Sequence, residues 1–126
     1  MTGERILVVE DNDKNMKLFR DVLVATGYRT LEATTGGEAI ELATAQAPDL
    51  VLMDIQMPDV DGVEALRRLR ADSRTAAIPV LAVTAQAMRG DREHFLAAGF
   101  DGYLSKPVNV RELIGTVRQH CAGRSG

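Results

Sequence analysis

The 126-residue chain has little of several features that define common protein classes. It contains a single cysteine, Cys121, so no disulfide can form within the chain and a cysteine-rich metal site is excluded. No apolar run approaches the roughly 20 residues that a membrane-spanning helix needs. The first residues, Met1 to Glu4, lack the basic and then apolar order of a secretory signal peptide. These absences predict a protein of the reducing cytoplasm, with no membrane among its partners.

A strong positive charge is absent as well. The chain has 18 acidic and 15 basic residues and a net charge of −3, which argues against nucleic acid as a direct partner. One local basic run, Arg67, Arg68 and Arg70, is flanked by Glu64 and Asp72, so we interpret it as a solvated helix face. The sequence also contains no phosphate-binding P-loop and no dinucleotide fingerprint.

The sequence does contain a regular alternation of short apolar runs and amphipathic segments. The apolar runs predict five strands, at residues 5–10, 29–33, 49–53, 80–83 and 101–104. Apolar residues at helical spacing predict five helices, at residues 15–26, 37–47, 62–71, 87–98 and 110–121. Because the strands alternate with helices through short loops, we predict a parallel sheet with helices on both faces.

The connectivity narrows the fold further. Right-handed crossovers leave few topologies, and the leading one is a doubly wound five-stranded α/β sheet of order 2-1-3-4-5, the flavodoxin-like arrangement. No repeat or linker divides the chain, so we expect one domain over residues 1–126, with residues 4–122 as its ordered core and a frayed C-terminal tail. In this topology the binding crevice lies at the carboxyl ends of the first and third strands.

Reactive side chains follow four of the five predicted strands. In chain order they are Glu10 and Asp11, then Asp54, Thr84 and Lys106. Each has a plainer explanation when taken alone, since Asp11 or the nearby Asp13 could simply cap the next helix. However, the carboxyl ends of parallel strands lie at one edge of a sheet. We therefore expect the five side chains to converge.

Three converging carboxylates repel one another unless a cation joins them. Mg²⁺ prefers oxygen ligands and commonly takes a few carboxylates while keeping some of its waters. Glu10, Asp11 and Asp54 are therefore the candidate ligands. Zinc is disfavoured because no close pair of histidine or cysteine is present, and we interpret His94 and His120 as surface residues on helices.

Four stretches of the sequence together resemble the receiver domains of response regulators in two-component signalling. They are residues 8–12 (VVEDN), 52–62 (LMDIQMPDVDG), 83–85 (VTA) and 102–107 (GYLSKP), and they fall in order over essentially the whole chain. The resemblance implies a phosphoacceptor rather than an enzyme, which assists its own phosphorylation and dephosphorylation. It implies two kinds of partner. One is a histidine kinase or histidine phosphotransfer protein, and the other is a downstream protein bound through the fourth helix, fifth strand and last helix.

The resemblance also implies a role for each matching residue. Asp54 is the phosphoacceptor, Glu10, Asp11, Asp54 and the Gln56 carbonyl hold Mg²⁺, Thr84 and Tyr103 form the switch, Lys106 contacts the phosphoryl group and precedes a cis proline, and Gln56 and Gln86 tune hydrolysis. The chemistry is physically reasonable, because a carboxylate that attacks a phosphoryl group needs its negative charge neutralised. Mg²⁺ and Lys106 can supply that charge, and Thr84 can donate a hydrogen bond.

Other interpretations share parts of this pattern. A haloacid-dehalogenase-type phosphatase needs a second aspartate two residues after the first, where this chain has Gln56. A flavodoxin-like FMN binder needs a small polar loop after the first strand, where residues 10–13 (EDND) would repel phosphate. Within the receiver family, Met1 and the last helix close to the C-terminus favour a free-standing regulator. The alternative is a receiver from a hybrid histidine kinase or a DNA-binding regulator.

Overall fold

The computed structural model describes residues 3–57, 59–85 and 91–122. Strands and helices alternate along these residues without exception. They are β1 (Arg5–Val9), α1 (Asp13–Ala25), β2 (Arg29–Ala33), α2 (Gly36–Gln46), β3 (Leu50–Asp54), α3 (Gly62–Ala71), β4 (Val80–Thr84), α4 (Asp91–Ala98), β5 (Gly102–Ser105) and α5 (Val110–Ala122). The predicted elements are all present, with ends that differ by a few residues. No described helix is both long enough and apolar enough to cross a membrane.

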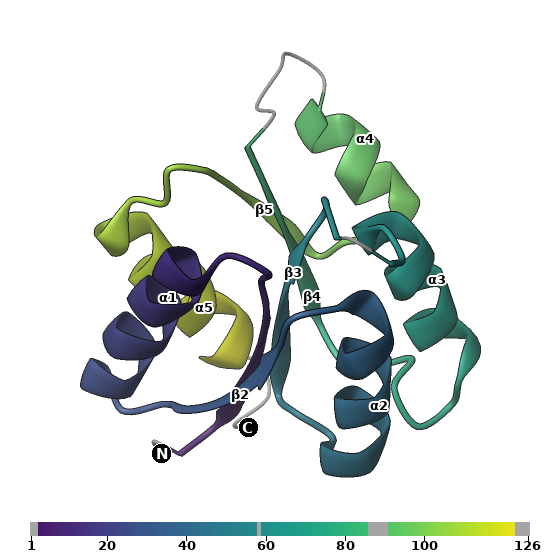
Figure 1. Cartoon of the computed structure of the whole chain (residues 1–126), viewed down its shortest axis with the longest axis horizontal. Coiled ribbons are helices and arrows are strands. Elements are labelled where there is room, and N and C mark those ends of the chain that lie inside the picture. The colour runs from purple at the N-terminus through teal and green to yellow at the C-terminus, as the bar shows by residue number, and fades with distance from the viewer. Residues whose placement is uncertain (1–2, 58, 86–90, 123–126) are drawn as a thin grey trace.

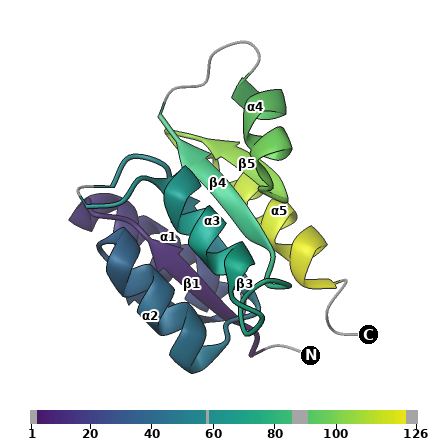
Figure 2. The ribbon, with the colours of Figure 1, turned by 90° about the vertical axis from the view of Figure 1, so that its right-hand side faces the viewer.

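The five strands form one sheet of order β2-β1-β3-β4-β5, in which every neighbouring pair is parallel. The predicted doubly wound topology is therefore confirmed. Figure 1 shows α1 and α5 on one face of the sheet and α2, α3 and α4 on the other. Figure 2, turned by 90°, shows α2 and α3 side by side in front of the sheet.

The central strands are buried on both faces, and their alternating side chains enter two separate cores. In β1, Leu7 packs with the α2 and α3 side while Ile6 and Val8 pack with the α1 and α5 side. In β3, Val51 and Leu52 divide in the same way. Burial on both faces explains why these strands are continuous apolar runs in the sequence. Packing in both cores also fixes the position and direction of each strand.

The ends of the first helix show how local chemistry sets the element boundaries. The helix begins at Asp13, two residues earlier than predicted, because the Asn12 side chain accepts hydrogen bonds from the amides of Lys14 and Asn15 at 3.0 Å each. The cap is thus Asn12 rather than either neighbouring aspartate. Gly27, at φ 101°, takes the left-handed conformation that follows the end of the helix.

The fourth helix ends as expected, at Gly99 with φ 114°. Residues 87–90, which we also predicted to be helical, lie outside the described residues. Within the described part the helix begins at Asp91.

The basic run on α3 is only partly the solvated face that we predicted. Arg67 and Arg68 are exposed and pair with Glu64 at 3.0 and 3.2 Å, as a solvated face should. The prediction is wrong for Arg70, whose side chain is 28% exposed and whose guanidinium meets four acceptors. The flanking acidic residues favoured a solvated position for Arg70, but the neighbouring turns bring backbone oxygen atoms to it.

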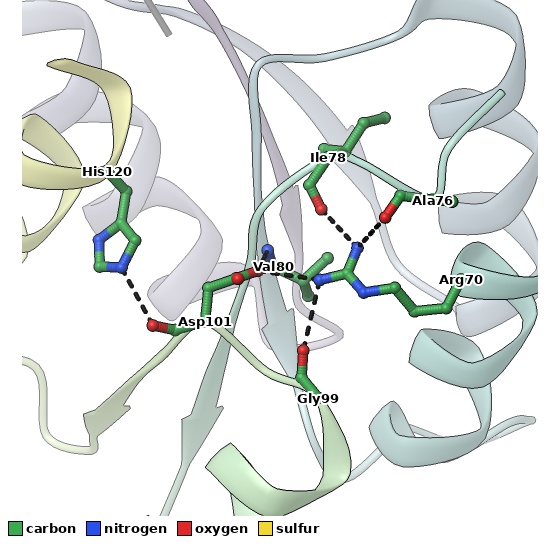
Figure 3. Close-up of polar contacts among 7 residues, drawn as sticks. All are labelled: Arg70, Ala76, Ile78, Val80, Gly99, Asp101 and His120. Atoms are coloured by element: carbon green, nitrogen blue, oxygen red, sulfur yellow. Dashed lines mark hydrogen bonds and ion pairs between the residues drawn. The ribbon is translucent and has the colours of Figure 1, made fainter. Parts of the chain in front are cut away.

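Figure 3 shows how Arg70 ties the amino-terminal edge of the sheet together. Its guanidinium donates to the carbonyls of Ala76, Ile78 and Gly99 and to Asp101 Oδ2, the last at 2.9 Å. Asp101 Oδ2 also accepts from the Val80 amide at 2.8 Å, and its carbonyl lies 3.2 Å from His120 Nε2. Arg70 thereby joins α3 to the turn that follows α4. Through Asp101 it also connects to the start of β4 and to α5. This junction lies at the opposite edge of the sheet from the predicted site.

Gly62, the first residue of α3, packs directly on the end of β3. A β-carbon at this position would lie 2.9 Å from the Asp54 carbonyl oxygen and 2.9 Å from Ile55 Cα. Both are backbone atoms, so neither can turn aside as a flexible side chain could. Only glycine lets the third helix start this close to Asp54.

We expect Gly62→Ala to lower the free energy of unfolding by about 1–3 kcal/mol, because the added methyl group overpacks a rigid contact. Gly115→Ala in α5 is the matched control, since among the described residues no atom beyond the local backbone of its own helix lies within 4 Å of the added β-carbon. That variant should be neutral or gain up to about 1 kcal/mol from helix propensity. Urea unfolding of both variants measures the difference. Equal stability would show that Gly62 is not sterically required.

Candidate functional site

The predicted site residues lie at the carboxyl edge of the sheet. Glu10 follows β1, Asp54 ends β3, and Thr84 ends β4. Thr84 pairs in register with Ser105, the last residue of β5, so Lys106 follows at the same edge. The topology alone brings side chains from four strands to one place.

Three carboxylates form the centre of this edge. Glu10, Asp11 and Asp54 each offer an oxygen within 4.8 Å of the others. Glu10 and Asp54 are buried, at 1% and 4% exposed, while Asp11 is exposed. The group is therefore closed on the protein side and open to solvent at Asp11, an arrangement in which a cation can keep part of its water shell.

Lys106 forms ion pairs with both buried carboxylates and offsets part of their negative charge. Its ammonium nitrogen lies 2.9 Å from Glu10 Oε1 and 3.0 Å from Asp54 Oδ2. Its backbone amide donates to the Thr84 carbonyl at 2.8 Å, which fixes the start of the connection after β5. The Lys106–Pro107 peptide bond is cis, as predicted.

These contacts shift the ionisation of the paired groups. Burial raises the pKa of the Glu10 carboxyl above its ordinary value of 4.5, with the nearby Asp54 charge acting in the same direction against the opposing effect of Lys106. Burial opposes the charge on Lys106, but the adjacent carboxylates of Glu10 and Asp54 together raise its pKa. The site thus carries more negative charge than its one ammonium group relieves.

The oxygen atoms of the site fit a hard divalent cation. Asp54 Oδ1 accepts the Gln56 amide at 3.0 Å, and Glu10 Oε2 accepts the Asn12 amide at 3.2 Å. Glu10 Oε1 is different, because it is buried and has no hydrogen bond within the described structure. Its approach to Lys106 is an ion pair by distance only. A buried carboxylate oxygen with spare capacity, beside two more carboxylates, suits Mg²⁺.

The two predicted switch residues occupy different surroundings. Thr84 is buried at 2% exposed, at the end of β4 beside the carboxylates. Tyr103 is half-buried on β5 and stacks on Phe95 of α4, with ring centroids 5.9 Å apart and planes inclined by 22°. The structure therefore links β5 to α4 through an aromatic pair.

The two glutamines divide between the described and undescribed parts of the chain. Gln56 is exposed just beyond Asp54, at the rim of the site. Gln86, the second residue predicted to tune hydrolysis, lies outside the described residues.

Comparison with known proteins decides the class to which this site belongs. Residues 6–118 match the family model of the response regulator receiver domain. The chain belongs to this family. A curated relative, the polar-differentiation response regulator DivK of Brucella ovis, is 47% identical over 115 residues, which cover 91% of this chain and 94% of DivK.

Solved receiver structures agree with the family assignment. The receiver domain of a sensor histidine kinase from Pseudomonas aeruginosa, which has a magnesium ion coordinated in its active site cleft, is 37% identical with a TM-score of 0.88. That match covers 96% of this chain and 99% of the other. A receiver domain of a Francisella response regulator is 28% identical with a TM-score of 0.89, over 98% of this chain and 100% of the other. This chain is therefore a receiver-domain response regulator of two-component signalling, and the family match decides against the phosphatase and FMN-binding alternatives.

The site contains one contact that the sequence did not reveal. Asp59, in the loop after β3, accepts hydrogen bonds from the amides of Gly36 and Gly37 at the start of α2. Its partners lie 22 and 23 residues earlier in the chain. No local pattern in the sequence predicts such a bond. The one sign in the sequence is that the segment from Asp54 to Asp61 contains a third aspartate, Asp59.

The carboxylate cluster predicts that Mg²⁺ stabilises the domain and that acid removes the effect. A ligand at a hundredfold excess over its Kd adds about 2.7 kcal/mol. For a domain of this size each kcal/mol raises the Tm by roughly 4 °C. At neutral pH we therefore expect a rise of about 10 °C at that excess.

The pH dependence follows from the raised pKa of Glu10. A carboxyl group whose pKa is higher in the folded protein weakens the fold as the pH rises from 4.5 through that raised value, and Mg²⁺ offsets this loss. Below 4.5 Glu10 is protonated in both states and no longer a good ligand, so the rise in Tm should largely vanish. Thermal melts with Mg²⁺, and with KCl of equal ionic strength as control, make the measurement. If Mg²⁺ raised the Tm by the same amount at neutral pH and below pH 4.5, the proposed role of Glu10 as a ligand would be contradicted.

Proposed function

We propose that this chain is a phosphoacceptor response regulator, which receives a phosphoryl group on Asp54 from a histidine kinase or a histidine phosphotransfer protein. The observation that carries the proposal is the ion pair between Lys106 and the buried Asp54, set against a cluster of three carboxylates. Asp54 is buried, paired with a positive charge and located at the end of a central strand, so its carboxylate can react with an incoming phosphoryl group.

The transfer exchanges one bond to phosphorus for another. An oxygen of Asp54 forms a bond to phosphorus while the bond between phosphorus and the donor imidazole nitrogen breaks, and the donor keeps that electron pair. Lys106 lies 3.0 Å from Asp54 Oδ2, so its ammonium group could contact the oxygens of a phosphoryl group on Asp54 and offset their negative charge. Thr84 is the neighbouring hydroxyl that can donate to the same oxygens.

The metal would be held by Glu10, Asp11 and Asp54, with the backbone carbonyl of Gln56 as a further oxygen. When bound, Mg²⁺ supplies positive charge where anionic nucleophile and anionic phosphoryl group meet. The spare buried oxygen of Glu10 supports this assignment. The magnesium ion in the cleft of the Pseudomonas aeruginosa receiver supports it as well.

Phosphorylation would be read out on the face formed by α4, β5 and α5. Thr84 would move toward the phosphoryl group and Tyr103 would turn inward, changing its stacking on Phe95. This face already has a surface hollow of about 530 Å³. Its lining comes from all three elements and includes Leu96, Tyr103, Ser105, Glu112, Thr116 and His120. We propose that a downstream protein binds here.

The lifetime of the phosphorylated form would depend on the rim of the site. Gln56 is exposed beside Asp54 and has a long amide that can orient or screen an attacking water. The family resemblance implies the same role for Gln86, which lies outside the described residues. This part of the proposal rests on the family resemblance and on the exposure of Gln56.

We propose further that residues 1–126 act as a single receiver domain in the cytoplasm, as a free-standing regulator. The similarity to DivK over 94% of that protein supports this context. A second candidate, a receiver that works within a hybrid histidine kinase, is favoured by the 37% identity to the Pseudomonas aeruginosa kinase receiver. A phosphotransfer screen against the histidine kinases of the source organism would separate the two contexts.

Asp54→Asn should abolish phosphorylation, because the amide is a poor nucleophile. Incubation with Mg²⁺ and acetyl phosphate should add one phosphoryl mass to the wild-type protein and none to the variant, as measured by intact-mass spectrometry. Asp61→Asn is the matched control. It makes the same chemical change seven positions away, at the N-cap of α3, and asparagine caps helices as well as aspartate. A fully phosphorylated Asp54→Asn would refute the assignment.

Lys106→Ala and Thr84→Ala should separate phosphorylation from switching. Both variants should still accept phosphate on Asp54, but Lys106→Ala should lose the link between the phosphoryl group and β5, and Thr84→Ala should lose one hydrogen bond. Amide NMR signals of Phe95 and Tyr103 should shift on phosphorylation in the wild type, less in Thr84→Ala and least in Lys106→Ala. Thr44→Ala, in α2, serves as the control. Wild-type shifts in both test variants would contradict the proposed coupling.

A further inference from the structure

The loop between β3 and α3 is closed at its base close to Asp54. The Gly62 amide donates to the Ile55 carbonyl at 2.9 Å, and the Gln56 amide donates to Asp54 Oδ1 at 3.0 Å. Asp61 caps the helix that follows, since its side chain accepts from the Glu64 amide at 2.8 Å. These three bonds are short-range in sequence and hold the two ends of the loop, while Met57 and Val60 between these ends are partly buried against the core on the α2 and α3 side.

The outer part of the loop is held by another helix. Asp59 Oδ1 accepts from the Gly36 amide at 2.8 Å, and Asp59 Oδ2 accepts from the Gly37 amide at 2.9 Å. These are first-turn amides of α2, which have no partner within their own helix. The side chain of the native cap, Thr35, accepts from the Glu38 amide at 3.1 Å, and within the described structure it accepts from neither glycine amide. The Asp59 carboxylate therefore completes the start of α2 from outside.

The contact is close-packed as well as polar. Gly36 is buried, and a β-carbon there would lie 2.9 Å from the Val60 carbonyl oxygen and 3.0 Å from Val60 Cβ. Hydrogen bonds from Gly37 and Gly36 lower the pKa of Asp59, so its carboxylate stays ionised at neutral pH. The positive end of the α2 dipole favours the same charge. Two consecutive loop residues are thus seated on the first turn of α2.

We propose that Asp59 is a positioning residue for the divalent cation, which clamps the β3–α3 loop onto α2 and so holds the Gln56 carbonyl in place. The inference rests on the proposed role of that carbonyl as a metal ligand. Gln56 lies between the bond at the loop base and the clamp at Asp59. Its own side chain is exposed, so its backbone position depends on these bonds and on the packing of the neighbouring Ile55 and Met57. The other ligands follow β1 or end β3 and do not depend on the clamp.

This division predicts a partial effect. Asp59→Ala should raise the Kd for Mg²⁺ by about tenfold, the lower end of the cost when a ligand loses its orienting partner. Saturating Mg²⁺ should restore the rate of Asp54 phosphorylation by acetyl phosphate, because the remaining ligands and Lys106 are intact. Hydrogen exchange at the Gln56, Gly36 and Gly37 amides should be faster than in the wild type even without metal.

Two controls separate positioning from charge and from helix stability. Asp61→Asn removes the same negative charge from the same loop while keeping a good cap. Thr35→Ala weakens the start of α2 without touching the loop. Each should change the Kd for Mg²⁺ by about twofold or less, the size of a screened interaction between exposed groups. Asp59→Asn, which keeps one acceptor oxygen, is the milder test variant and should fall between Asp59→Ala and the wild type.

The titrations are made by calorimetry on the full chain, with circular dichroism to verify folding. A Kd for Asp59→Ala within twofold of the wild-type value would overturn the inference. An equal rise in Asp61→Asn would also overturn it, because charge alone would then explain the effect. Failure of the wild-type protein itself to bind Mg²⁺ or to be phosphorylated on Asp54 would instead refute the proposed function.

Discussion

Two buried carboxylates, Glu10 and Asp54, share one ammonium group, that of Lys106, and the rest of the site follows from this imbalance. Removing a charged group from water costs free energy, and a single cation between two anions leaves negative charge uncompensated. The raised pKa of Glu10 is the direct sign of that cost. A site with excess negative charge favours added positive charge, the more so because one buried oxygen of Glu10 accepts no hydrogen bond from the described residues. The same imbalance suits a reaction in which a phosphoryl group and a cation arrive together.

The parallel sheet makes this concentration of charge possible. Each central strand divides its side chains between two apolar cores, so its position and direction are fixed from both faces. The carboxyl ends of β1, β3 and β4 therefore meet in register, and the acidic residues cannot move apart to relieve their repulsion. The hydrophobic cores thus supply the free energy that holds an unfavourable charge cluster in place.

Two long-range anchors hold the frame around the sheet. At the amino-terminal edge, Arg70 joins α3 to the turn after α4 and, through Asp101, to the start of β4 (Figure 3). At the carboxyl edge, Asp59 joins the loop after β3 to the start of α2. In both anchors a charged group with two or more hydrogen-bonding atoms, a guanidinium or a carboxylate, bonds to backbone groups. Such paired hydrogen bonds fix the orientation of the side chain as well as attracting it. The α2 and α3 side of the molecule is consequently tied at both edges.

The sequence by itself determined the order and type of the elements, the parallel topology and the strand ends at which the carboxylates stand. It could do so because apolar periodicity and capping chemistry are local, and because the ends of parallel strands must share an edge. Only the tertiary structure decided that Arg70 leaves the solvated face and that Asp59 reaches α2. The Asn12 cap of α1 is a local contact, but residue type alone does not distinguish Asn12 from Asp11 or Asp13 as the cap. The long-range bonds of the two anchors join residues 21 to 31 positions apart. Such bonds depend on the side-by-side packing of complete elements, which no local pattern records.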